Sequence, residues 1–324
     1  MLNRSSAVAV FSALTLAACG DTQAPDSDQS RLDPSGGLPV LTSARVVAAA
    51  APGPAGDYSI TLRFINPPTA TQEARFTEAK AKWEGIIIGD VPAISGTIPA
   101  RSCGNSFKTP AFTGTIDDIL IDVLLQPIDG PGAVLGAAGP CLVRSADNLS
   151  VYGFMYFDTA DLDFLENIGF FDEVVIHEMG HVLGFGTLWN FGRSLLEGVG
   201  TTDPRFNGPL AIAAYADLKG SGTVPVEGDQ GGSGTLYGHW DEATFFNELM
   251  TGFLNSSATA NPLSIVTVGS MGDLGYVIDP DAGDRYKLPS TGGPSLDVAG
   301  VAGRGRDLDI ARREMLIKPS GRVQ

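Results

Sequence analysis

The chain has 324 residues, of which 43% are hydrophobic, a formal net charge of −16 at pH 7 and a pI near 4.4. This length and hydrophobic content suit one large globular domain or two small ones and exclude a disordered chain. The negative charge argues against nucleic acid or an anionic lipid surface as a partner, and we interpret it as a contribution to solubility. The 41 glycines and 21 prolines predict many turns and long loops.

The N-terminus carries a candidate export signal. An apolar run at Ala7–Ala18 is too short to cross a bilayer as a permanent helix, and its end, Leu-Ala-Ala, is followed by Cys19. This sequence resembles the lipobox of bacterial lipoproteins. The resemblance implies that residues 1–18 are removed and that Cys19 is acylated, which would anchor the protein in the membrane of the bacterial cell envelope, with the outer membrane favoured. The alternative is an ordinary secretory signal with an incidental cysteine.

Residues 19–56 predict a flexible tether, because they are rich in Asp, Ser, Pro, Gly and Ala and show no apolar periodicity. The first regular elements follow this tether. Apolar and polar residues alternate over Tyr58–Phe64, which predicts a strand. Over residues 71–86 the apolar residues recur at steps of three and four, which predicts a helix that packs on the core through one face.

Two further strands are predicted at Ile119–Leu125 and Val151–Phe157. A loop rich in Gly and Pro follows the first of them and runs through Pro140. The next predicted helix begins near Asp172, whose negative charge suits a helix N-terminus, and it ends at Gly184. The resulting order is strand, helix, strand, strand, helix, with no visible internal repeat.

The sequence after Gly186 is rich in loops. It contains an apolar stretch at Pro209–Leu218, a helical segment predicted at residues 239–250, and a second apolar segment at residues 262–278. The last predicted element is a short surface helix at residues 307–317. These elements are shorter and less regular than those of the first half.

The motif that carries chemistry lies in the second predicted helix. It reads His177-Glu178-Met179-Gly180-His181, the pattern HExxH. On a helix, positions i and i+4 lie on one face, so the two imidazoles can bind one zinc ion and the glutamate can reach a water molecule on that ion. The chain has only three histidines, and the third is His239. This economy is a first indication that none of the three histidines is incidental.

A longer pattern includes this motif. Residues 177–184 read HExxHxxG, which resembles the metzincin metallopeptidases. Their third histidine usually follows the glycine by three residues, but that position is Thr187 here. The leishmanolysin-like branch has a long insertion before the third histidine, and His239 lies after such an insertion. Residues 247–252 resemble the segment around the third ligand of that branch, and residues 270–276 resemble the turn that places a methionine beneath the zinc.

The resemblance implies a role for each of these residues. His177, His181 and His239 would hold one catalytic Zn²⁺, with a fourth position open to water. Glu178 would take a proton from that water and pass it to the leaving amine, and Met271 would pack beneath the site. The implied function is a zinc-dependent endopeptidase that acts on protein or peptide substrates.

Two alternatives stay open from the residues alone. Glu248 competes with His239 as third ligand, because Asn-Glu after a distant HExxH resembles the thermolysin-like enzymes. A catalytically silent, zinc-stabilised surface-binding lipoprotein competes with the enzyme. Glu178 favours the enzyme, because a silent protein has no need of a carboxylate beside its first ligand.

Two cysteines remain after Cys19, namely Cys103 and Cys141. In an exported protein an even pair most often forms a disulfide, and closing this loop would stabilise the fold by roughly 3–4 kcal/mol. The alternative, a Cys103 thiolate that caps the zinc ion as an inhibitor, is less simple because Cys141 offers a partner. We therefore expect the disulfide.

These observations predict an α+β, metzincin-like fold. Its first half is a mixed sheet with two helices, one of them the active-site helix, and its second half is loop-rich with a methionine turn. The predicted divisions are a signal peptide, a tether, an N-terminal catalytic subdomain, a C-terminal catalytic subdomain and a tail, at residues 1–18, 19–56, 57–186, 187–286 and 287–324.

Overall fold

The computed structural model describes residues 57–132, 134–230, 234–255, 260–289, 308–310 and 313–324. All of them belong to one compact unit. The predicted signal peptide, Cys19 and the tether lie outside the described residues. Among the described residues, none of the helices combines the length and the apolar character that a membrane span requires.

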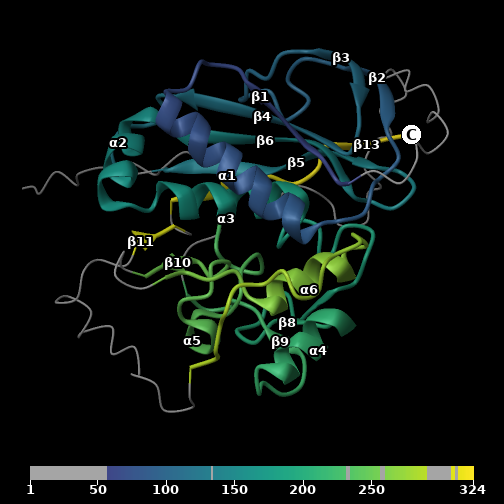
Figure 1. Cartoon of the computed structure of the whole chain (residues 1–324), viewed down its shortest axis with the longest axis vertical. Coiled ribbons are helices and arrows are strands. Elements are labelled where there is room, and N and C mark those ends of the chain that lie inside the picture. Colours follow the sequence, from purple (N-terminus) through teal and green to yellow (C-terminus); the bar gives the residue numbers. More distant parts are fainter. Residues whose placement is uncertain (1–56, 133, 231–233, 256–259, 290–307, 311–312) are drawn as a thin grey trace, which may run out of the picture. The chain divides into compact units, whose positions relative to one another are not determined.

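Long elements fill the first half of the chain and short ones the second (Figure 1). The first half contains β1 (Ile60–Phe64), α1 (Ala70–Ile86), β2 (Ile94–Ile98), β3 (Phe112–Ile116), β4 (Ile119–Gln126), β5 (Gly136–Arg144), β6 (Ser150–Asp158), α2 (Thr159–Ile168) and α3 (Phe171–Leu183). The second half contains β7 (Leu196–Glu197), β8 (Arg205–Phe206), α4 (Pro209–Asp217), β9 (Val224–Pro225), α5 (Glu242–Phe245), β10 (Phe253–Leu254), α6 (Ile265–Asp273), β11 (Leu308–Asp309), β12 (Glu314–Leu316) and β13 (Gly321–Val323).

The largest sheet in the described part of the chain has six strands. Its order is β1-β4-β6-β5-β12, and β13 also pairs with β5. Strands β1, β4 and β6 are parallel, β5 is antiparallel to β6, and both β12 and β13 are parallel to β5. The sheet is therefore mixed, and together with the helices it forms the α+β fold that the sequence predicts.

Strand β4 shows why the sheet is buried on both faces. Its side chains alternate, so Ile119, Ile121 and Val123 enter one core while Leu120 and Leu124 enter another. Helices α1 and α3 lie side by side over the first face (Figure 1). The hairpin of β2 and β3 contributes to the second core. A strand that is buried on both faces has a continuous run of apolar residues. For this reason the sequence of β4 predicted a central strand.

Strand β5 replaces part of the predicted Gly- and Pro-rich loop. All nine of its residues are buried. Its register with β6 shifts between Pro140 and Leu142, which is a bulge of the kind that accommodates Gly and Pro in a strand. The prediction was wrong there because the residues that indicate a loop also occur in irregular strands.

Two predicted helices are also wrong. Within residues 239–250 only α5 is helical, and the described residues between 308 and 317 form strands β11 and β12 instead of a surface helix. Glu314 of β12 is buried rather than exposed. Strand β12 forms because it pairs with β5, far earlier in the chain, and such long-range pairing leaves no periodic signal in the local sequence.

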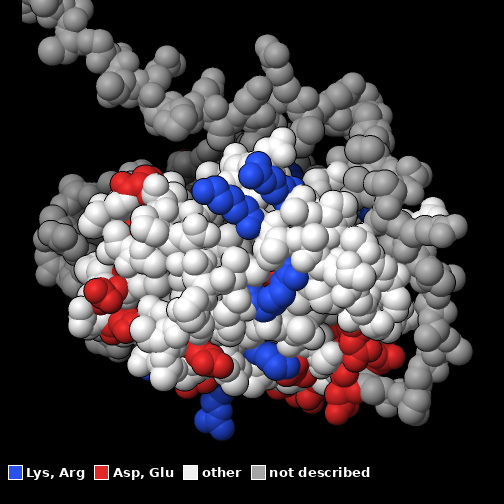
Figure 2. All heavy atoms as spheres, turned by 90° about the horizontal axis from the view of Figure 1, so that it is seen from above, with Lys and Arg blue, Asp and Glu red and all other residues white. Residues whose placement is uncertain are grey.

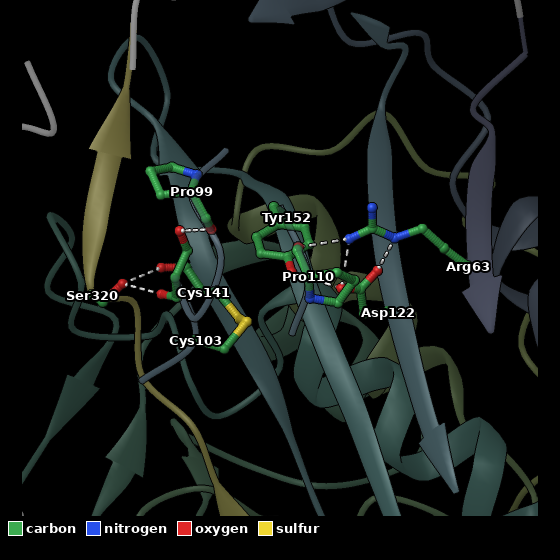
Figure 3. Close-up of a disulfide and its surroundings, with 9 residues drawn as sticks. Arg63, Pro99, Cys103, Pro110, Asp122, Cys141, Tyr152 and Ser320 are labelled. Atoms are coloured by element: carbon green, nitrogen blue, oxygen red, sulfur yellow. Dashed lines mark hydrogen bonds and ion pairs between the residues drawn. A yellow bond between two sulfur atoms is a disulfide. The ribbon is translucent and has the colours of Figure 1, made fainter. Parts of the chain in front are cut away.

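A disulfide joins Cys103 to Cys141 of β5, which confirms the predicted pair (Figure 3). Near it, the hydroxyl of Ser320 donates to the carbonyl of Cys141 at 3.1 Å, so the C-terminal segment contacts the same strand. Also in this view, buried Asp122 accepts a hydrogen bond of 2.6 Å from Nε of Arg63. These interactions fix the centre and one edge of the sheet.

Figure 2 shows one face of the molecule coloured by charge. Of the described residues on this face, Lys and Arg lie near the middle, and Asp and Glu lie toward the lower and left margins. Wide uncharged areas separate them. On this face the acidic charge of the described residues is therefore spread rather than gathered into one patch.

Candidate metal centre

Helix α3 carries the first two histidines and the glutamate of the motif, and it is fixed against helix α1. The indole Nε1 of Trp83 donates a hydrogen bond of 2.9 Å to the carbonyl of Ile176. Gly180 lies at the contact, because a Cβ atom there would come within 2.8 Å of the Trp83 ring. The absence of a side chain lets the two helices approach closely, and this packing sets the position of the motif.

The third histidine reaches α3 through a close approach of two backbone segments. Gly186 has a φ of 68°, and a Cβ atom there would lie 2.1 Å from the carbonyl oxygen of Gly238. Only glycine permits this approach, which brings His239 to the helix. The next residue, Trp240, is fully buried and packs against Trp189 with ring centroids 5.1 Å apart. This aromatic packing holds the segment in place.

The Nε2 atoms of the three histidines form a small triangle. The distances are 2.9 Å between His177 and His181, 3.1 Å between His181 and His239, and 3.2 Å between His177 and His239. All three side chains are fully buried. A zinc ion binds imidazole nitrogens at about 2.0–2.1 Å, which places tetrahedral ligands roughly 3.3 Å apart. The triangle therefore has the size that one zinc ion requires.

Hydrogen bonds at the other ring nitrogen fix the protonation of each histidine. Nδ1 of His177 lies 2.7 Å from the carbonyl of Leu249, Nδ1 of His181 lies 3.0 Å from that of Phe185, and Nδ1 of His239 lies 3.0 Å from that of Thr235. A carbonyl oxygen only accepts, so each Nδ1 carries a proton, and in the neutral imidazole Nε2 is then the nitrogen whose lone pair can bind a metal ion. The donor set fits zinc.

Glu178 is buried beside this triangle. Neither of its carboxylate oxygens has a hydrogen-bond partner from an N–H group or hydroxyl among the described residues. Burial raises the pKa of Glu178 well above its usual value, and the negative charge of Glu314 raises it further. A buried carboxylate with a raised pKa and no N–H or hydroxyl donor is suited to exchange a proton with a substrate or a water molecule.

Glu314, which the sequence did not indicate, completes the cluster. Its Oε1 lies 2.7 Å from Nε2 of His239, and its Oε2 lies 3.2 Å from Nε2 of His177 and 3.8 Å from that of His181. The four side chains form a buried group that can hold one metal ion. Nothing in the local sequence distinguishes Glu314 from the other acidic residues near the C-terminus. The pairing of β12 with β5 places it at the three histidines.

The titration behaviour of the cluster reflects its mixed charges. Burial lowers the pKa of His181 well below its usual value. For His239, burial acts in the same direction, but the Glu314 carboxylate outweighs it and raises the pKa. Burial also opposes ionisation of Glu314, yet the charges of His239 and His181 hold its pKa well below the usual value. The neighbouring imidazoles therefore keep Glu314 ionised.

Glu248, the competing third ligand, has a different role. Its Oε1 accepts hydrogen bonds from the hydroxyls of Ser264 at 2.8 Å and Thr267 at 2.6 Å, and its Oε2 accepts one from the N–H of Met250 at 2.6 Å. These donors occupy the carboxylate, and Glu248 is not part of the metal-binding group. The structure thus brings His239, rather than Glu248, to the two helical histidines.

The sequence predicts a methionine turn at Met271, but Met271 does not lie in a turn. That residue is buried in helix α6. The methionine that contacts the active-site helix is Met250, because a Cβ atom on Gly180 would lie 3.0 Å from its terminal methyl. Met250 lies in the same short segment as Leu249, whose carbonyl orients His177. Its position close after His239 in the sequence is a signal that could have identified it.

The α+β fold, the HExxH helix and a third histidine converging on the same point define a metallopeptidase of the HExxH class. A family model described as leishmanolysin, Peptidase_M8, matches residues 95–280, which is more than half of the chain. The chain therefore belongs to the leishmanolysin family of metallopeptidases. A search of curated proteins finds no match. The matched region includes the three histidines and Glu178, but it ends before Glu314.

Proposed function

We propose that the chain is a zinc-dependent endopeptidase that hydrolyses peptide bonds of protein substrates. The observation that carries this proposal is the buried triangle of three Nε2 atoms, beside a carboxylate that has no N–H or hydroxyl partner among the described residues. Family membership supports the peptidase class. His177, His181 and His239 would hold the zinc ion.

A zinc ion bound there supplies Lewis-acid polarisation and makes water more acidic. Glu178 accepts a proton from the attacking water as the water oxygen adds to the scissile carbonyl carbon. The protonated Glu178 then gives this proton to the departing nitrogen as the carbon–nitrogen bond breaks, so the carboxylate is restored and the products are an acid and an amine. The raised pKa of Glu178 favours the second transfer, because a proton that is held too weakly is not delivered to the amine.

The location of the enzyme is a second part of the proposal. The Leu-Ala-Ala-Cys sequence at residues 16–19 supports an acyl anchor at Cys19 in the bacterial cell envelope. Labelling with a radioactive fatty acid tests it. The wild-type protein should incorporate label, whereas Cys19→Ser should not. Equal labelling of the two proteins, or none of the wild type, would contradict the anchor.

The catalytic proposal is tested by zinc content and casein cleavage together. The wild type and Glu178→Ala should each bind one zinc ion per chain, and Glu178→Ala should lose at least about 100-fold in cleavage rate. The same pair is also compared in a Glu314→Ala background, because Glu314 lies over the histidine nitrogens. Cleavage that survives Glu178→Ala would sink the mechanism. Zinc binding by all four proteins with no cleavage by any of them, including Glu314→Ala, would favour the silent lipoprotein.

A further inference from the structure

We propose that the C-terminal segment, residues 313–323, is a built-in inhibitor that lies along β5 across the metal centre and supplies Glu314 as a fourth metal ligand. The full chain would then be latent, and it would become active when the segment leaves. This inference rests on the proposed peptidase function. It concerns residues beyond the region that matches the family, which ends at residue 280.

The position of Glu314 provides the first argument. Catalytic zinc sites have three protein ligands and keep one position open, whereas a site with four protein ligands is closed. Oε1 of Glu314 lies 2.7 Å from His239 and Oε2 lies 3.2 Å from His177, so the carboxylate covers the histidine triangle. Its side chain is fully buried. A carboxylate in this place takes the position that water and a substrate carbonyl need.

The pairing of the segment with β5 provides the second argument. Strand β5 is antiparallel to β6 on one side, and its other edge is covered by β12 and β13. The N–H of Leu135 donates to the carbonyl of Arg313 at 2.6 Å, and the N–H of Ile317 donates to the carbonyl of Ala138 at 2.8 Å. An uncovered strand edge accepts extended peptides by strand addition. The segment occupies the edge that lies next to the metal centre.

Two glycines permit this close fit. A Cβ atom on Gly139 of β5 would lie 2.1 Å from the carbonyl oxygen of Ile317. A Cβ atom on Gly238, immediately before the third histidine, would lie 2.5 Å from the Cδ1 atom of Leu316. The segment therefore contacts both the sheet and the third-ligand loop. An extended substrate chain at the same edge would meet the same two positions.

Two variants release the segment in different ways. Glu314→Ala removes the carboxylate from the cluster and keeps the backbone. Ile317→Pro keeps the carboxylate but removes the N–H that binds Ala138, and it therefore weakens the strand pairing. Lys318→Ala is the matched control, because its side chain is exposed in the same segment. The four full-length proteins are loaded with Co²⁺ for absorption spectra and with Zn²⁺ for casein cleavage.

We expect Glu314→Ala to change the visible Co²⁺ spectrum, because one protein ligand is lost, and Lys318→Ala to leave it unchanged. Casein cleavage should rise at least about tenfold in Glu314→Ala and Ile317→Pro, the change expected when a segment bound in roughly nine molecules of ten is released. Cleavage by the wild type at the rate of both variants would overturn the inference while leaving the peptidase function intact. If no protein cleaves casein, the proposed function fails, and an unchanged Co²⁺ spectrum in Glu314→Ala would separately refute the metal contact.

Discussion

Nδ1 of His177 lies 2.7 Å from the backbone carbonyl of Leu249 and donates a hydrogen bond to it. This bond connects the active-site helix to a short segment of the second half of the chain. Glu248 holds that segment, because its carboxylate accepts hydrogen bonds from Met250 and Thr267. The residue that competes with His239 as a ligand in the sequence thus positions a ligand instead.

Glu248→Gln should therefore weaken folding without removing the metal. The glutamine side chain would place its own N–H group against the N–H and hydroxyl groups that now donate to the Glu248 carboxylate. The lost hydrogen bonds should lower the free energy of unfolding by about 1–3 kcal/mol. Urea denaturation of the zinc-free protein measures this cost, and atomic absorption measures zinc. We expect a lower free energy of unfolding and a zinc content close to one per chain. Loss of zinc with unchanged stability would show that Glu248 is a ligand after all.

Gly180→Val should destabilise the protein by about 1–3 kcal/mol through overpacking. A Cβ atom there would lie 2.8 Å from Trp83, and the ring is held by its hydrogen bond to Ile176. Gly85→Ala is the matched control, since Gly85 lies in α1 with nothing within 4 Å of an added Cβ. The control should be stabilised by roughly 0.5–1 kcal/mol because alanine favours a helix. Equal stability of the two variants in denaturant titrations would contradict the close packing of α1 on α3.

Removing the disulfide should cost roughly 3–4 kcal/mol, because the bond closes a loop with a sequence separation of 38. The double variant Cys103→Ser/Cys141→Ser avoids a free thiol, and its midpoint in guanidinium chloride gives the cost. Reduced wild type is the matched comparison and should lose a similar amount. If the double variant unfolds at the wild-type midpoint, the bond does not stabilise the fold.

His239→Ala in a Glu314→Ala background should abolish stoichiometric zinc binding, because only two histidines and no Glu314 carboxylate then remain in the cluster. Zinc that binds only the folded state raises the unfolding temperature, so a chelator should lower the melting temperature of Glu314→Ala. It should have little effect on the double variant Glu314→Ala/His239→Ala. A chelator-induced shift of the same size in both proteins would contradict the role of His239.

The sequence predicted structure correctly where a short local pattern of residues determines it. The spacing of His177 and His181 identified the metal face of a helix, and the apolar run of β4 identified a central strand. It was uninformative for β5 and β12, because their strands depend on pairing between distant segments. Glu314 was missed for the same reason. Met271 was assigned by resemblance alone, and packing places Met250 against α3 instead.

The most direct measurement compares casein cleavage by zinc-loaded Glu314→Ala with that by Glu314→Ala/Glu178→Ala. The two proteins differ only at the proposed base, and neither has the carboxylate that covers the histidines. We predict one zinc ion per chain in both, and cleavage at least about 100-fold faster in the protein that keeps Glu178. Equal cleavage by both proteins, or no cleavage by either, would contradict the proposal of a zinc endopeptidase with Glu178 as its base.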